Sequence, residues 1–255
     1  MFLAMIFPFS IMSLPIHIAF DALSAVDGSA RFSFAHTTAI ASVSGPITPR
    51  PATEHPVRAA IDVHVRPLPG VSATPEKHVA SALRGVLERA CVLAQLPRTA
   101  IQVVVQVLSP LAIGKDGDVD KDVRLAAQIN AASLALLNAG SVPMRGVVCA
   151  VSVAQAQSGQ PQLVTDPSRD KTPAAYSGCF AFLFGVDPAY ASPDDQDMDT
   201  DTANDAAPPA KMIWTNCRAC PGEAFSTASL AQAEQEARKG AAIVWMKMKA
   251  SVSAP

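Results

Sequence analysis

Residues 122–140 read DVRLAAQINAASLALLNAG, and this stretch decides the fold class. Ala126, Ile129, Ala132 and Leu136 recur at helical spacing, which predicts a helix that begins at Asp122. Gly140 follows as a natural C-terminal stop. Because the stretch is apolar almost all round, the helix should be buried on every side. The rest of the chain must therefore supply the layers that cover it.

The segments on either side of this helix read as a mixture of strands and helices. Apolar and polar residues alternate from Arg58 to Arg66, as in a half-buried strand, and residues 100–108 form a more apolar strand. Thr74 and Pro75 open a helix between them. The whole chain is predicted to be one α+β domain. Its other predicted elements are a strand pair near residues 32–43, strands at 147–153, 162–165, 177–184 and 211–216, and a last helix from about Ser226.

The composition of the 255 residues excludes several classes of protein. Hydrophobic residues make up 49% and charged residues 16%, which is incompatible with a disordered or collagen-like chain. The net charge of -2 hides an uneven distribution, because residues 187–205 hold seven Asp and no Lys or Arg. Without them, 15 acids face 20 bases, a net charge of +5. We predict an exposed acidic insertion at about residues 187–209 that is dispensable for folding.

Residues 1–20 carry no charged side chain, so a signal peptide or a membrane span has to be considered. Pro8 and Pro15 interrupt the stretch, it has no basic n-region, and translation could start at Met12. We therefore expect an extension outside the fold, with the domain at residues 21–255. The five cysteines are too few and too scattered for a disulfide framework, and Cys217 and Cys220 form only half of a zinc site.

Several blocks of the sequence resemble the RNase PH family. They occur in that family's order and spacing, and two of them, at residues 97–102 and 129–132, are most similar to ring subunits of the eukaryotic RNA exosome. The resemblance implies an RNase PH-like fold (ribosomal protein S5 domain 2-like) with mixed sheets packed against helices. It also implies a ring around an RNA channel. The matching blocks are residues 27–38, 41–46, 96–109, 129–140, 142–145 and 163–167.

The chain departs from the family's catalytic pattern, which predicts that it has no catalytic residues. Active members hold phosphate in a glycine-rich turn at a helix N-terminus, where free N–H groups bind the anion. Here that turn is degenerate, with Asp122, Val123, Arg124 and Leu125 in its place. Asp166 and Asp170 alone do not make a credible acid/base pair. We expect an inert chain without cofactor or metal; the alternative is an active phosphate-dependent 3′-to-5′ exoribonuclease.

The remaining expectations concern RNA and protein partners. Arg66, Lys77 and Arg84 lie in the region that corresponds to the family's RNA-facing loop, so they are candidates for phosphate contacts, with ordinary solvated charges as the alternative. The expected function is to support rRNA maturation and RNA turnover by ring assembly and RNA threading. Expected partners are other RNase PH-like ring subunits, cap subunits with RNA-binding domains, an associated catalytic ribonuclease and RNA in the channel, without a membrane. The expected locations are nucleus, nucleolus and cytoplasm.

Overall fold

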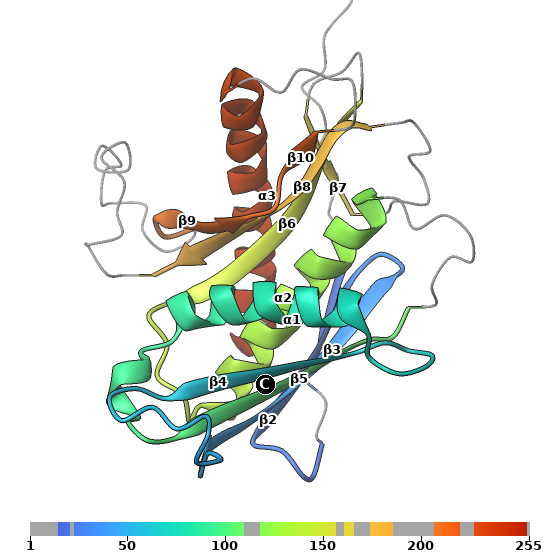
Figure 1. Cartoon of the computed structure of the whole chain (residues 1–255). Helices are drawn as coiled ribbons and strands as arrows, with labels where there is room; N and C mark the ends of the chain where they lie inside the picture. The colour runs from blue at the N-terminus through green and yellow to red at the C-terminus, as the bar shows by residue number, and fades with distance from the viewer. Residues whose placement is uncertain are drawn as a thin grey trace, which may run out of the picture.

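The computed structural model describes residues 15–20, 23–109, 118–156, 161–165, 174–185, 207–219 and 227–253. Most of the predicted acidic insertion, together with Asp166, Asp170 and Cys220, lies outside these residues. Two sheets and three long helices form alternating layers, as Figure 1 shows. The predicted α+β class is confirmed.

The first sheet has five strands in the order β1-β2-β3-β5-β4. All neighbours are antiparallel except β4 and β5, which run parallel. In β4, Ile61, Val63 and Val65 are buried while Asp62, His64 and Arg66 are exposed, as the alternation predicts. The strands are β1 (Ile16–Ala19), β2 (Gly28–Phe34), β3 (Thr37–Ile47), β4 (Ala60–Arg66) and β5 (Ala100–Val107).

The second sheet is antiparallel and is built around the long pair of β6 and β8. The strand order is β10-β8-β6-β7, and β9 also pairs with β8. Its strands are β6 (Val147–Ala156), β7 (Gln162–Val164), β8 (Ala174–Phe184), β9 (Ala210–Thr215) and β10 (Arg218–Ala219).

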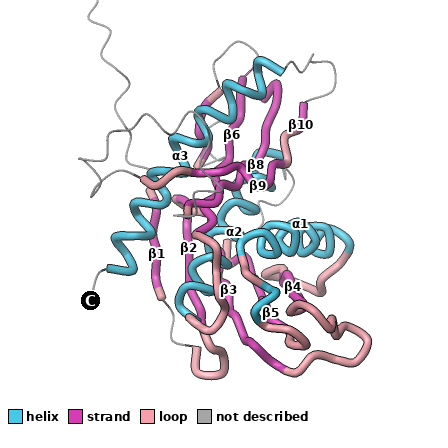
Figure 2. The backbone as a smooth tube through the Cα atoms, turned by 90° about the vertical axis from the view of Figure 1, so that its left-hand side faces the viewer, coloured by secondary structure: helices cyan, strands magenta, loops and turns pink. Residues whose placement is uncertain are grey.

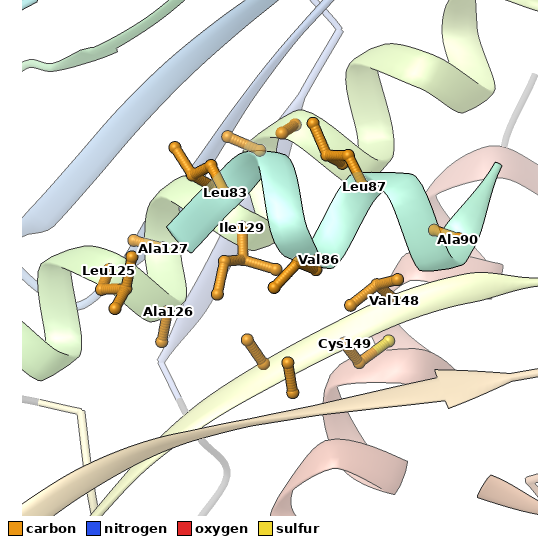
Figure 3. Packing of buried hydrophobic residues seen from close by; sticks show 14 of the residues in the cluster. Leu83, Val86, Leu87, Ala90, Leu125, Ala126, Ala127, Ile129, Val148 and Cys149 are labelled. Carbon is orange, nitrogen blue, oxygen red and sulfur yellow. The ribbon is translucent and has the colours of Figure 1, made fainter. Parts of the chain in front are cut away.

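The helices are α1 (Thr74–Ala90), α2 (Asp118–Ala139) and α3 (Thr227–Ser253), with a short 3-10 turn at Leu93–Gln95. Helix α2 packs against β2 and β3 on one side and against β6 and β8 on the other, which confirms that it is the buried helix. Figure 3 shows α1 side chains such as Leu83 and Val86 beside Ile129 of α2. Helix α3 covers the outer face of the second sheet through β6 and β8.

Three sequence predictions need correction. Residues 16–19 are not outside the fold, because they form β1 and pair with residues 31–34 of β2; Figure 2 shows β1 beside α3. Helix α2 begins at Asp118, one turn before Asp122, with two acids in its favourable first turn. Helix α1 is capped at Ala73, one residue before the predicted Thr74, because the Glu76 carboxylate accepts the Ala73 N–H at 2.7 Å.

The described helices include none that is both long and apolar enough to cross a membrane. The longest, α3, buries a narrow stripe of mostly small residues against the second sheet. Its other residues are partly or fully exposed.

At Gly28 the backbone of β2 lies very close to the backbone of α2. A Cβ atom at this position would overlap backbone atoms of Ala135 and Ala139. We expect Gly28→Ala to lower the free energy of unfolding by about 1–3 kcal/mol, because two backbones must move apart. Urea denaturation followed by circular dichroism measures this change. At Gly85 in α1, an added Cβ would meet only the flexible Arg89 guanidinium, at an ordinary contact distance of 3.8 Å. Gly85→Ala should therefore stabilise by about 0.5–1 kcal/mol; equal losses in both variants would contradict the explanation.

Candidate functional site

A cavity of about 380 Å³ lies where the first turns of α2 meet the β4–α1 connection and the strands β9 and β10. Its cationic lining residues are Arg66, Lys121, Arg124 and Arg218. The two acidic ones are Glu76 and Asp122, so cations outnumber carboxylates by two among the described lining residues. This balance favours an anionic ligand.

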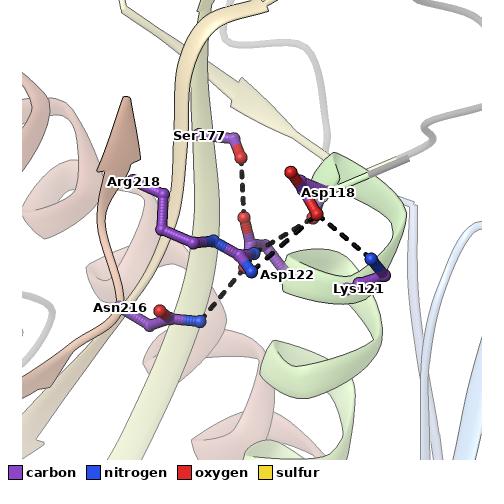
Figure 4. A network of polar contacts seen from close by, with 6 residues as sticks. All are labelled: Asp118, Lys121, Asp122, Ser177, Asn216 and Arg218. Carbon is purple, nitrogen blue, oxygen red and sulfur yellow. Dashed lines mark hydrogen bonds and ion pairs between the residues drawn. The ribbon is translucent and has the colours of Figure 1, made fainter. Parts of the chain in front are cut away.

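Asp122 is the most deeply buried polar group of the cavity, with a side chain that is 0% exposed. Its Oδ1 accepts a hydrogen bond from Arg218 Nη2 at 2.6 Å, and its Oδ2 accepts one from Ser177 Oγ at 2.8 Å. Asn216 Nδ2 donates a longer bond to Oδ1 at 3.5 Å. Figure 4 shows these side chains converging from β8, β9–β10 and α2. Asp122 therefore joins α2 to the second sheet.

Arg218 makes a second set of contacts to the first turn of α2. Its Nη2 donates to the Asp118 carbonyl oxygen at 3.5 Å, and its Nη1 lies 3.9 Å from the Asp118 carboxylate. Lys121 Nζ lies 3.1 Å from the same carboxylate. Two of the four cations of the cavity are thus held by acids of α2.

Burial raises the pKa of Asp122 to about 6, although the Ser177 hydrogen bond and the Arg218 charge both act to lower it. A carboxyl group with such a pKa could serve as a general acid or base. Here, however, both of its oxygens are occupied by protein donors. Asp122 is therefore a buried structural anchor and not a group poised to exchange a proton with a ligand.

Glu76, the second carboxylate of the cavity, is also engaged. Its Oε2 accepts the backbone N–H of Ala73 and closes the N-terminus of α1. Within the described residues, no group of three or more His, Cys, Asp or Glu side chains is placed to hold a metal ion. The described part of the cavity thus offers positive charge, but its carboxylates are committed to other partners.

The structure places the predicted RNA-contact residues in two different environments. Arg66 lines the cavity, and Lys77 is exposed on α1 between the lining residues Glu76 and His78. Arg84 does not line the cavity; it lies two turns further along α1, with its Nη2 4.0 Å from the Asp62 carboxylate. The cavity therefore includes Arg66, has Lys77 beside it and excludes Arg84.

The degenerate phosphate turn is not a helix end in this structure. Asp122, Val123, Arg124 and Leu125 all lie inside α2, so Asp122 bonds to side chains of the second sheet and not to free N–H groups. Val123 is buried in the core, while Arg124 and Leu125 line the cavity.

Sequence reasoning missed several residues of the site. Arg218 and Ser177 lie 96 and 55 positions from Asp122, and no local pattern marks either of them. Trp214, also on the cavity wall, appeared only as one apolar residue of a predicted strand.

The layered α+β fold is shared with exosome core proteins. The chain superimposes on a structure of rice (Oryza sativa) Rrp46 with a TM-score of 0.70 and 20% identity, over 94% of this chain and 95% of that one. A structure described as an archaeal exosome core gives a TM-score of 0.59 with 16% identity, over 92% and 86%. At these identities the comparison defines the fold alone.

Residues 13–141 match the model of the 3′ exoribonuclease family (RNase PH), domain 1. This match covers half of the chain, and the chain belongs to the RNase PH family. The resemblance that the sequence blocks indicated is therefore confirmed.

Within the family, the chain is similar in sequence to components of exosome complexes. Exosome complex component rrp46 of Schizosaccharomyces pombe is 37% identical over 130 residues, 51% of this chain and 53% of that protein. Exosome complex component RRP46 of Saccharomyces cerevisiae is 33% identical over 149 residues, 58% and 65%. Exosome complex component Rrp41 of Pyrobaculum aerophilum is 37% identical over 148 residues, 54% and 56%. The chain thus spans between about half and two thirds of the length of these relatives.

Proposed function

We propose that the chain is a non-catalytic subunit of an RNA exosome ring. The observation that carries the proposal is the commitment of Asp122, whose two carboxylate oxygens are occupied by Arg218 and Ser177. Family membership and the similarity to exosome components support the ring assignment. The chain would support RNA maturation and turnover by ring assembly and by lining a path for RNA.

The partners of such a subunit would be other RNase PH-like ring subunits, cap subunits with RNA-binding domains and an associated catalytic ribonuclease. RNA would pass beside the cationic cavity, with Arg66 and Lys77 as the better candidates for backbone contacts. Arg84 is the weaker candidate because it faces Asp62. We propose that the chain is located in the nucleus, the nucleolus and the cytoplasm. Affinity purification followed by mass spectrometry tests the proposed partners, and imaging of a tagged chain tests the proposed locations.

The competing function is phosphate-dependent 3′-to-5′ exoribonuclease activity. The cationic lining of the cavity is the observation in its favour, because phosphate and an RNA end are both anions. Asp166 and Asp170 of the sequence would have to supply the acidic groups, and they lie outside the described residues.

Incubation of the purified full chain with RNA and inorganic phosphate distinguishes the two functions. We expect no release of nucleoside diphosphates, because the described carboxylates of the cavity are bound to protein donors. The matched control is the Asp166→Asn/Asp170→Asn variant under the same conditions. Release of nucleoside diphosphates by the unmodified chain, lost in that variant, would overturn the non-catalytic assignment.

A further inference from the structure

A second hollow, the α1–β9 groove, lies at the C-terminal end of α1, away from the cavity at its N-terminal end. It has a volume of about 420 Å³. We define it by the residues that line it: Glu88, Arg89, Arg145, Leu183, Lys211, Met212 and Ile213. None of them lines the first cavity.

Three elements meet to form this groove. The Arg145 N–H donates to the Ala90 carbonyl oxygen at 2.8 Å, which ties the residues before β6 to the last turn of α1. Lys211 pairs with Leu183 in the β8–β9 ladder. Helix α1 also contacts β9, and Figure 1 shows its last turn facing the β8–β9 end of the second sheet. Arg89, Arg145 and Lys211 are thereby gathered from distant parts of the chain.

The apolar part of the groove depends on an irregularity in β9. The ladder pairs Phe182 with Met212 but Ala181 with Trp214, so Ile213 is an extra residue at a bulge. A bulge interrupts the alternation of side chains. Lys211, Met212 and Ile213 therefore all line the groove, although they are consecutive. Met212 and Ile213 are half-buried and provide an apolar floor over the buried Leu183, whereas Lys211 belongs to the cationic rim.

The charge of the groove is strongly one-sided. Arg89, Arg145 and Lys211 are exposed, and Glu88 is the one acid among the lining residues that the structure describes. A further cation, Arg58, lies 4.0 Å from the Glu88 carboxylate and offsets it. A ligand of this groove should therefore carry negative charge.

We propose that the α1–β9 groove is a docking site for a partner protein segment in which acidic and large aliphatic side chains alternate. The acids would face Arg89, Arg145 and Lys211, and the aliphatic side chains would cover Met212 and Ile213. An RNA strand fits less well, because none of the described lining residues is aromatic and could stack on a base. Residues 187–205 of this chain also fit less well, because Tyr190 and Met198 are their only large apolar residues.

Fluorescence anisotropy with the full chain and a short labelled peptide of alternating Glu and Leu tests the site. We expect saturable binding that weakens as salt is added. Arg89→Gln/Lys211→Gln should raise the Kd about tenfold, because two rim charges are lost. Lys239→Gln/Lys247→Gln, which removes two exposed cations from α3, is the matched control and should leave the Kd unchanged.

Three further measurements identify the occupant. A peptide in which Ser replaces every Leu should bind more weakly. Equal binding would show that the groove recognises only the charge of the peptide, and this would overturn the proposal. Tighter binding of an oligouridylate, lost in Arg89→Gln/Lys211→Gln, would assign the groove to RNA instead. Peptide binding that appears only after deletion of residues 194–206 would assign it to the chain's own acidic stretch. Absence of binding to the unmodified chain, or equal loss in the α3 control, would also overturn the proposal.

Discussion

Replacement of Arg218 by methionine is expected to lower the free energy of unfolding by about 2–3 kcal/mol at about pH 7.5. The variant keeps an apolar side chain in place but removes the charge 2.6 Å from Asp122 Oδ1. Asp122 is 0% exposed, so without Arg218 it must either keep a buried charge without a counter-ion or take up a proton at a cost in stability. Chemical denaturation of both chains measures the difference.

The loss in Arg218→Met should depend on pH in a defined direction. The pKa of Asp122 rises from 3.8 in the unfolded chain to about 6 in the folded one. Between these values the folded chain keeps a proton that the unfolded chain has lost, so this group lowers stability as the pH rises from about 4 to about 6. Arg218 opposes that loss only when Asp122 is ionised. Its removal should therefore matter less at about pH 5 than at about pH 7.5.

Two comparisons separate the buried ion pair from a general effect of losing an arginine. Asp122→Asn/Arg218→Met removes both charges and should recover part of the stability of Arg218→Met. Arg98→Met breaks a 2.6 Å pair with Glu54 on the surface and should change stability little. A pH-independent loss, or an equal loss in Arg98→Met, would show that Asp122 is not the reason.

Asn130→Ala is expected to lower the free energy of unfolding by about 2–4 kcal/mol, because it leaves two buried backbone groups without partners. Asn130 is fully buried in α2. Its Nδ2 donates to the Ala150 carbonyl oxygen at 2.9 Å, and its Oδ1 accepts the Ala150 N–H at 2.7 Å. Strand β7 pairs with β6 only at residues 152–154, so it does not reach Ala150. Asn130 completes the hydrogen bonding of this edge of β6.

Asn138→Ala is the matched control for Asn130→Ala. Asn138 also lies on α2 and also donates to a strand carbonyl, that of Ser29, at 3.0 Å. It is exposed, however, so water can replace the lost partner. We expect a change of about 0.5–1.5 kcal/mol by urea denaturation. If both variants lost the same stability, the buried backbone of Ala150 would not explain the role of Asn130.

Much of the fold follows from short-range patterns in the sequence. The alternation at residues 61–66 gives β4, and the all-round apolar character of residues 123–136 gives the buried helix α2. Helix starts were less accurate, because a start depends on which side chain caps which N–H. Thus α2 begins at Asp118 and α1 is capped through Glu76.

The candidate site was predicted only in part. Arg66, a predicted candidate for RNA contact, and Arg124, from the degenerate turn, both line the cavity, but their contact with phosphate stays a prediction. Asp122 was expected at a helix end, but α2 begins one turn earlier, and the partners of Asp122 come from the second sheet. The prediction that residues 16–19 lie outside the fold was wrong, because they pair with β2 at the edge of the first sheet. The sequence alone does not show that this edge is open to an apolar segment.

The sequence by itself determined the α+β class, the central buried helix, the family and the separation of acidic from basic charge. These properties depend on the composition of the chain and on patterns among residues that are close together in the sequence. Only the tertiary structure decided that Arg218 and Ser177 hydrogen-bond to the two carboxylate oxygens of Asp122. It also decided that β1 pairs at the edge of the first sheet and that Arg89, Arg145 and Lys211 line one groove. The physical reason is that each of these contacts joins residues far apart in the chain, and packing alone brings them together.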